Sequence, residues 1–213
     1  MIAYAARTGT RRNLDALRGA DWRLMVSARG VLRTEGFPYA LDNGAWTAFQ
    51  RGEPFDVPAF ERAVKMLGSG ADWIVVPDIV MGSLASLAFS RRWLKNLRRR
   101  VALRDQTFLI AVQNGMEPKH LRRLLGRKVG IFVGGDTEWK LATMKQWADL
   151  AHSRGAICHV GRVNTAVRIH ACEAAGVDSF DGSSASRFSV TLRPLELARQ
   201  QTDLEGYLAR LAA

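Results

Sequence analysis

The stretch GIFVGGDTEWKLATMKQWADLAHSRGAICHVGR, residues 130–162, contains a strand, a helix and a second strand in that order. The runs at 130–136 and 156–162 are apolar and β-rich, and residues 139–155 between them follow a helical pattern that ends at a glycine. A strand with one exposed face would alternate apolar and polar residues, whereas these runs are almost continuously apolar. Such strands are typical of a parallel sheet that helices cover on both faces.

The same unit recurs along the chain. Further β-rich runs occupy residues 2–6, 23–28, 39–44, 72–78, 107–115 and 178–182, and further helical patterns occupy residues 58–67, 83–103, 118–126, 164–176 and 193–212. A strand and helix repeated about eight times predict a compact (β/α)8 TIM-type barrel that forms one domain over residues 1–213. The main alternative is an open doubly wound sheet, but no G-x-G-x-x-G motif follows the first strand.

Composition indicates an ordinary globular protein. The apolar fraction is 47% and the charged fraction is 24%. The N-terminus lacks the order of a secretory signal and no apolar run reaches the ~20 residues of a membrane span, so we expect a cytoplasmic protein. The two cysteines, Cys158 and Cys172, form neither a disulfide framework nor a zinc motif, and we expect no metal and no cofactor.

The net charge of +11 comes mostly from arginine, which occurs 25 times against 6 lysines. The planar guanidinium suits phosphate, so an anionic polymer is a natural partner. The alternative is that the arginine-rich composition reflects genomic bias, with the charge spread over solvated helix faces. Two arginine-rich segments, residues 91–100 and 119–128, are candidates for a nucleic-acid surface. The alternative, which we favour slightly, is that they are the solvated outer faces of amphipathic helices.

Polar residues and glycines gather where the predicted strands end, which is the edge that carries the chemistry in barrels of this kind. They are Asp42 and Asn43, Asp78, Gln113, Gly134 with Gly135 and Asp136, Gly161 with Arg162, and Asp181. Each acid has a structural alternative, because Asp42 could start a turn and Asp78 and Asp136 could cap helices. Several acids and an amide on one rim favour a site for a planar, hydrogen-bonding ligand such as guanine.

Six motifs on successive strand ends carry a resemblance to a known family. They are LDNGAW (41–46), VVPDIV (75–80), AVQNG (111–115), FVGGD (132–136), HVGR (159–162) and SFDGSSASR (179–187). In this order they resemble the barrel motifs of the tRNA-guanine transglycosylase superfamily. The closer similarity is to its compact branch, the DNA 7-deazaguanine transglycosylases (the DpdA family) of phages and bacterial modification islands.

The resemblance implies that guanine in a polynucleotide is exchanged for a 7-deazaguanine, such as a preQ0-like base, without strand cleavage. Asp181 would attack C1′ and form a covalent glycosyl intermediate, and Asp42 would transfer protons to the outgoing base and from the incoming one. The residues expected to hold the base are Asp78, Gln113, Asn43, Gly161 and the Gly134–Gly135 backbone. Asp136 would read the substituent at the 7-position.

Other residues are expected to contact the polynucleotide. Arg162 and Arg187 are candidates for the adjoining phosphates, and Arg7, Arg11 and Arg12 lie just past the first strand. Trp46 and Phe49, expected on a loop after Asp42, could stack on a base, although burial in the core is the default for aromatic residues. His159 is interpreted as a core residue, because it has no partner in the sequence pattern.

The chain lacks the Cys-x-Cys-x-x-Cys and His zinc motif that follows the eighth strand in the tRNA enzymes. We therefore expect DNA, with a flipped or single-stranded guanine, in place of tRNA. The location would be the host cytoplasm if a phage encodes the chain. Alternatives are a catalytically silent nucleic-acid-binding subunit, a tRNA enzyme, or an unrelated barrel enzyme with a sugar-phosphate substrate. A homodimer or a helper protein is left open.

Overall fold

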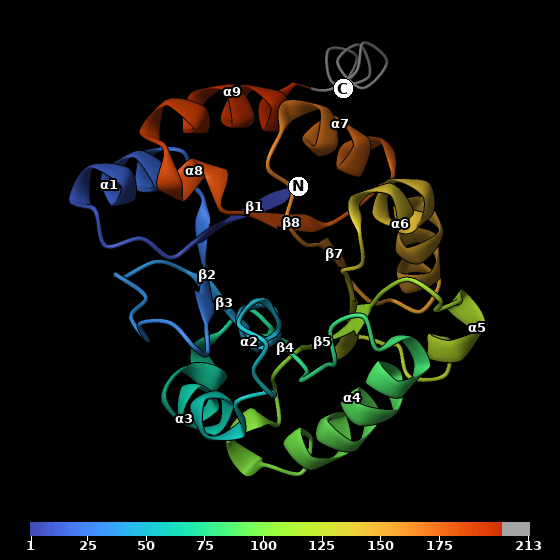
Figure 1. Cartoon of the computed structure of the whole chain (residues 1–213). Coiled ribbons are helices and arrows are strands. Elements are labelled where there is room, and N and C mark those ends of the chain that lie inside the picture. Colours follow the sequence, from blue (N-terminus) through green and yellow to red (C-terminus); the bar gives the residue numbers. More distant parts are fainter. Residues whose placement is uncertain (202–213) are drawn as a thin grey trace.

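The structure is a computed structural model that describes residues 1–201. Eight parallel strands close into a barrel in sequence order, and the last strand pairs with the first (Figure 1). The strands are β1 (Ile2–Ala6), β2 (Arg23–Ser27), β3 (Tyr39–Asp42), β4 (Ile74–Val75), β5 (Phe108–Val112), β6 (Val129–Val133), β7 (Cys158–Val160) and β8 (Ser179–Gly182). The predicted (β/α)8 barrel is confirmed, and each predicted strand is present.

Most of the helices surround the barrel, and the second lies over one end of it (Figure 1). They are α1 (Arg11–Gly19), α2 (Ala45–Gln50), α3 (Val57–Leu67), α4 (Ser83–Leu97), α5 (Pro118–Leu121), α6 (Thr137–His152), α7 (Ala166–Ala174), α8 (Ser184–Arg187) and α9 (Ser189–Gln200), with short 3-10 turns at Gly68–Gly70 and Val101–Leu103. The helices α1, α2 and α8 were not predicted. The predicted helix at 193–212 corresponds to α9 as far as Gln200, and residues 202–213 lie outside the described residues.

The strands are buried on both faces because the barrel separates two apolar layers. The layer inside the barrel consists of Tyr4, Met25, Ala40, Trp73, Val75 and Leu109, with Phe132 and Ile157 packed against them. The larger layer lies between the strands and the surrounding helices. Every residue of β5 is buried, which accounts for its continuous apolar sequence.

Aromatic rings fill the barrel interior below the carboxyl ends of the strands. The Trp73 ring lies 5.2 Å from the Tyr4 ring and 4.6 Å from the His159 ring, measured between centroids. The Phe132 ring stacks on His159 at 4.9 Å. The barrel is therefore a packed core, and functional groups have room only at its ends.

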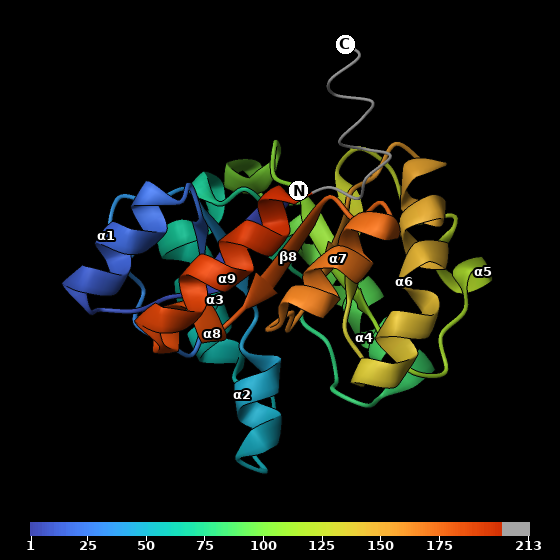
Figure 2. The same ribbon diagram turned by 90° about the horizontal axis from the view of Figure 1, so that it is seen from above.

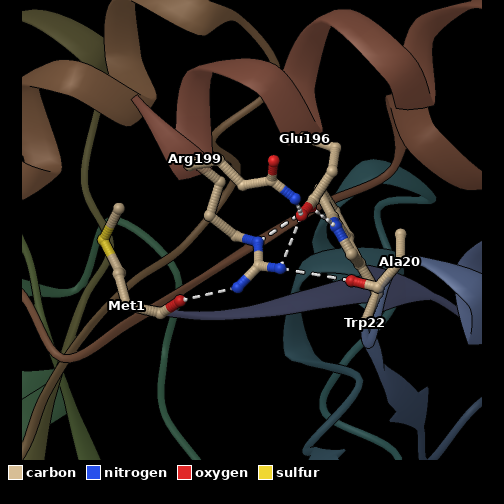
Figure 3. A network of polar contacts seen from close by, with 6 residues as sticks. Met1, Ala20, Trp22, Glu196 and Arg199 are labelled. Carbon is tan, nitrogen blue, oxygen red and sulfur yellow. Dashed lines mark hydrogen bonds and ion pairs between the residues drawn. The ribbon is translucent and has the colours of Figure 1, made fainter. Parts of the chain in front are cut away.

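Helix α9 fastens the end of the described chain to its beginning (Figure 3). Arg199 donates hydrogen bonds to the carbonyl oxygens of Met1 at 3.3 Å and Ala20 at 3.2 Å, and pairs with Glu196 at 2.7 Å. The indole N–H of Trp22 donates to the same glutamate at 2.6 Å. These contacts close the helical layer over the β8–β1 seam.

Arg199→Ala is expected to lower the free energy of unfolding by about 1–3 kcal/mol, because it removes the donor to the Met1 and Ala20 carbonyl groups and the ion pair with Glu196. Chemical denaturation measures the change. The matched control is Arg193→Ala, at an exposed arginine on the same helix, which is expected to change stability by less than about 0.5 kcal/mol. Equal stability of the two variants would contradict this role for Arg199.

Candidate active site

Three carboxylates lie at the end of the barrel where the strands terminate. Asp42 is the last residue of β3, Asp181 lies in β8, and Asp78 follows β4. Burial is the main cause that raises the pKa of Asp42 and of Asp78; the charge of Asp181 adds to the rise at Asp42, and the charge of Asp42 adds to it at Asp78. The structure therefore brings together the three rim acids that the sequence identified.

Asp181 is held by groups from the neighbouring strand β7 and the loop that follows it. Its Oδ1 atom lies 3.0 Å from His159 Nε2, and its Oδ2 atom accepts a long hydrogen bond of 3.4 Å from the backbone N–H of Arg162. The Asp181 side chain keeps 17% of its surface exposed. Its carboxylate is thus fixed in orientation and still reachable from the barrel mouth.

His159 is fully buried, and burial lowers its pKa although the Asp181 carboxylate opposes the change. The imidazole is therefore neutral near pH 7. Because an ionised carboxylate only accepts hydrogen bonds, the Nε2–H donates to Asp181 and Nδ1 accepts from the Ser179 hydroxyl, 2.8 Å away. His159 is a positioning residue that the sequence interpretation missed. The alternation of side chains along a strand could have identified it. His159 pairs with Ser179 in the β7–β8 register, and Ser179 lies two residues before Asp181, so the two side chains of β8 share a face.

Asp42 lies where burial raises its pKa to about 6, and the charge of Asp181 adds to the rise. The backbone N–H of Gly44 donates to Asp42 Oδ2 at 3.0 Å and opposes it. Ser27 lies directly opposite Asp42 in the β2–β3 register. The Asp42 side chain also forms the turn into α2, since Gly44 has a left-handed φ of 80°. Asp42 therefore serves the turn and carries a proton-binding group near neutrality.

Asp78 is held by Asn43. The Asn43 amide donates to Asp78 Oδ1 at 2.8 Å and to the Val76 carbonyl at 2.9 Å, while its own oxygen accepts from the Ala45 N–H at 2.8 Å. Burial raises the pKa of Asp78 to about 6, and the hydrogen bond from Asn43 opposes the rise. Asn43 is buried, and its amide is used in these three bonds. It therefore positions Asp78 and α2, whereas we had expected it to contact the base directly. Asp78 is not a helix cap, because Gly82 precedes α4.

Asp78→Asn is expected to stabilise the protein above pH 6. The folded-state pKa of about 6 exceeds the ordinary 3.8, so ionisation costs stability as pH rises from about 4 to about 6. Asparagine removes that cost, about 1–3 kcal/mol at pH 8, and still accepts from Asn43. Denaturation at pH 8 and pH 4 measures it, and the gain should vanish at pH 4. Asp105→Asn, at an exposed site, is the matched control, and a loss of stability at pH 8 in Asp78→Asn would refute the assignment.

The glycine at 161 allows close packing under the site. A Cβ there would lie 2.6 Å from Phe132 Cζ and 3.3 Å from Asp181 Oδ1. Its carbonyl accepts from Lys140 Nζ at 2.5 Å. Lys140 is buried on α6, and burial lowers its pKa to about 8. Gly161 and Lys140 therefore fix the β7 loop beside Asp181, and Lys140 is a second residue that the sequence interpretation missed.

Arg162 spans the mouth from the carboxylate site to α2. It has a left-handed φ of 60°, a conformation that is uncommon for a residue other than glycine. Its guanidinium donates to the Gly135 carbonyl and lies 4.2 Å from the centroid of the Trp46 ring. The backbone of Arg162 thus contacts Asp181, and its side chain contacts the β6 loop and α2.

Gln113 is also buried at the mouth. Its Nε2 atom donates to the Ile79 carbonyl at 2.9 Å, which ties the end of β5 to the loop after β4. This bond fixes the Gln113 side chain next to Ile79, the residue that follows Asp78. A ligand would meet the part of the amide that this bond leaves unused.

The residues of the β6 loop that we expected to bind the base have other contacts in the structure. The N–H of Gly134 donates to the Val112 carbonyl at 2.8 Å, so the sheet uses it, and Gly135 contributes its carbonyl to Arg162. Asp136 is exposed and caps α6, accepting from the Trp139 N–H at 2.8 Å and from Asn114 at 2.6 Å. The hydrogen bond from the Trp139 N–H is the main cause that lowers the pKa of Asp136. We therefore exclude Asp136 and the Gly134 N–H from the candidate site.

The four arginines expected to contact nucleic acid differ in availability. Arg7 is mostly buried and forms an ion pair with Glu35, so it is not a free cation. Arg11, Arg12 and Arg187 are exposed. Arg11 lies 3.8 Å from an aspartate on α1, an exposed ion pair that constrains it little.

Two further properties concern residues 1–201. This part of the chain has no group of three or more His, Cys, Asp or Glu side chains arranged to hold a metal ion. Within the same residues, every helix is too short or too polar to cross a membrane.

Comparisons with known proteins bear on the fold alone. No family model matches the chain, and no curated protein matches it. Among solved structures, that of RipC from Yersinia pestis is similar, with a TM-score of 0.56 and 12% identity over 96% of this chain and 97% of that chain. At this identity the similarity supports the (β/α)8 barrel architecture and carries no information on activity.

Proposed function

We propose that the protein exchanges guanine in DNA for a 7-deazaguanine base through a covalent intermediate on Asp181. One observation carries the proposal: Asp181, oriented by neutral His159, shares the barrel mouth with Asp42, whose pKa is raised to about 6. A nucleophilic carboxylate beside a proton-binding carboxyl is the pair that glycosyl transfer with a covalent intermediate requires. The resemblance of six strand-end motifs to the DNA 7-deazaguanine transglycosylases supports the same reaction.

In the first half of the reaction, an Asp181 carboxylate oxygen attacks C1′ of the target deoxyguanosine. The C1′–N9 bond breaks and its electron pair goes to the departing guanine, which takes a proton from Asp42. The Asp181 carboxylate stabilises the positive charge that develops on the sugar and then bonds to C1′. His159 holds the carboxylate in the orientation for attack.

In the second half, the incoming base gives its N9 proton to Asp42, which the first step has left ionised. Its N9 atom then attacks C1′, and the bond between C1′ and the Asp181 oxygen breaks. Asp181 is restored as a carboxylate and Asp42 is again protonated. The two halves balance without an oxidant, a reductant or a metal, and the phosphodiester bonds stay intact.

Asp78 and Gln113 are the groups that we assign to the edge of the base. Both lie at strand ends next to the reacting carboxylates, and Asn43 fixes the orientation of Asp78. A carboxylate accepts from the N1–H and exocyclic amine of guanine, a pattern that 7-deazaguanines share. This shared edge would let one subsite bind the outgoing base and then the incoming one.

A sugar-phosphate enzyme is the alternative that the contacts favour least. Its phosphate would need free backbone N–H groups at the loops after β6, β7 and β8. Those of Gly134 and Gly161 donate to strand carbonyls, and those of Ser183 and Ser184 donate to Asn164 Oδ1 at 2.8 and 3.0 Å. DNA as substrate is supported by the net charge of +11 and by the exposed Arg11, Arg12 and Arg187.

Incubation of the protein with labelled guanine and a guanine-containing oligonucleotide tests the proposal. Label should enter DNA, and a 7-deazaguanine should displace it. Label in tRNA alone would replace DNA with tRNA as the substrate. Salt-dependent DNA binding without exchange of any of these bases would favour the silent-subunit alternative.

A further inference from the structure

Helix α2 carries two exposed aromatic side chains beyond the barrel mouth. Trp46 is 39% exposed and Phe49 is 44% exposed, and their ring centroids lie 5.7 Å apart with planes 30° from parallel. Figure 2 shows α2 projecting from the end of the barrel. The core does not need these rings, because the buried residues of α2 are Ala45 and Ala48. They form an aromatic surface that stands clear of the barrel.

The base of α2 is rigid. The N–H groups of its first residues donate to Asp42 and Asn43, at 3.0 and 2.8 Å. A Cβ at Gly44 would lie 2.8 Å from Arg29 Cγ, so the chain before the helix packs directly on that arginine. Beyond the helix, Glu53 pairs with Arg29 at 2.5 Å. The aromatic surface is thus held in a fixed position relative to the carboxylates.

Arg162 links this surface to Asp181. Its guanidinium lies 4.2 Å from the Trp46 ring centroid, and its backbone N–H reaches Asp181 Oδ2 at 3.4 Å. A nucleotide whose C1′ meets Asp181 would therefore have its chain neighbour within reach of α2. Arg51, the exposed residue that follows α2, adds a cation on the same projection.

Aromatic faces beside arginines are what proteins use to bind single strands, because every base has a π face and every linkage has a phosphate. Extruding a guanine also unstacks the bases on either side of it. A fixed aromatic surface next to the reaction centre can restore the lost stacking. The chemistry of α2 therefore matches an opened DNA strand better than an apolar protein partner, for which the arginines would be unfavourable.

We propose that Trp46 and Phe49 form a stacking surface for the DNA base next to the extruded guanine, with Arg162 and Arg51 contacting the adjoining phosphates. The inference rests on the proposed base exchange for the identity of the bound strand. It concerns binding of the flanking base, which is measurable without any exchange.

The test uses a single-stranded oligonucleotide with 2-aminopurine next to one guanine. The wild-type protein is expected to quench its fluorescence, and Trp46→Ala to lose the quenching and bind about 5- to 150-fold more weakly. Trp46→Phe should retain part of both effects. The matched control is Val101→Ser, at a 79% exposed apolar residue beyond the far end of α4, which should behave as wild type.

Wild-type affinity and quenching in Trp46→Ala would overturn the stacking surface. So would a change of oligomeric state in Trp46→Ala, measured by sedimentation, with unchanged DNA affinity, because α2 would then bind a second copy. An abasic site in place of 2-aminopurine should remove the difference between wild type and Trp46→Ala. Quenching by a wild-type protein that exchanges no base would refute the proposed function and leave the stacking surface standing.

Discussion

Replacing Asp181 with asparagine is expected to reduce base exchange by at least about a thousandfold, because the variant lacks the attacking group. The neutral amide neither bonds to C1′ nor stabilises the positive charge on the sugar. Its oxygen can still accept from His159 Nε2, so the local structure is retained. Incorporation of labelled guanine into DNA measures the loss.

DNA affinity is the internal control for Asp181→Asn. The substitution leaves Arg162 and α2 in place, so the dissociation constant for the oligonucleotide should stay close to that of the wild type. Exchange at the wild-type rate would show that another group attacks C1′. A joint loss of binding and folding, seen by circular dichroism, would call for Asp181→Glu, which keeps the charge and should also fail because the carboxylate is displaced.

Replacing Asp42 with asparagine is expected to slow exchange by about 10²–10⁴-fold, the range for removal of a general acid and base. The raised pKa matters here. With a pKa of about 6 in place of the ordinary 3.8, the protonated fraction at pH 7 is on the order of a hundredfold larger. Asp42 can then give a proton to the departing guanine near neutral pH, which an ordinary aspartate could not do efficiently.

This assignment sets the sign of the pH dependence. The free enzyme needs protonated Asp42, so kcat/KM for DNA should fall above about pH 6. The residual activity of Asp42→Asn should lack this fall, whereas Asp78→Asn should keep it. A wild-type profile with no fall above about pH 6, or a fall that persists in Asp42→Asn, would contradict the role of Asp42.

The barrel was predictable because its buried strands have distinctive apolar sequences. The β5 sequence is apolar at every position, and burial of all five residues follows from a parallel sheet with a filled interior and a helical exterior. The short helix α2 was not predictable. Its six residues are too few for a helical pattern, and its N-cap residue is Gly44, which has no side chain to signal a helix start, so Trp46 and Phe49 were wrongly expected on a loop.

The site was predictable to the extent that it depends on strand ends. Asp42 and Asp181 follow from the rule that barrels place functional groups there. Partners of these groups depend on register and packing. His159 meets Asp181 because β7 pairs with β8 in one register, and the Gly134 N–H is used because β6 continues its pairing with β5 by one residue. Arg7 forms an ion pair with Glu35, which lies in a segment whose sequence follows neither a helical nor a strand pattern.

The most direct test of the account is mass spectrometry of the covalent intermediate. Wild-type protein mixed with a short guanine-containing oligonucleotide, without any incoming base, and quenched in denaturant should carry the oligonucleotide, less guanine, on the peptide that contains Asp181. Asp181→Asn should carry none, and later addition of a 7-deazaguanine to unquenched wild-type complex should remove the adduct. Exchange in the wild-type protein with no adduct on that peptide, or an adduct on another residue, would contradict the central claim.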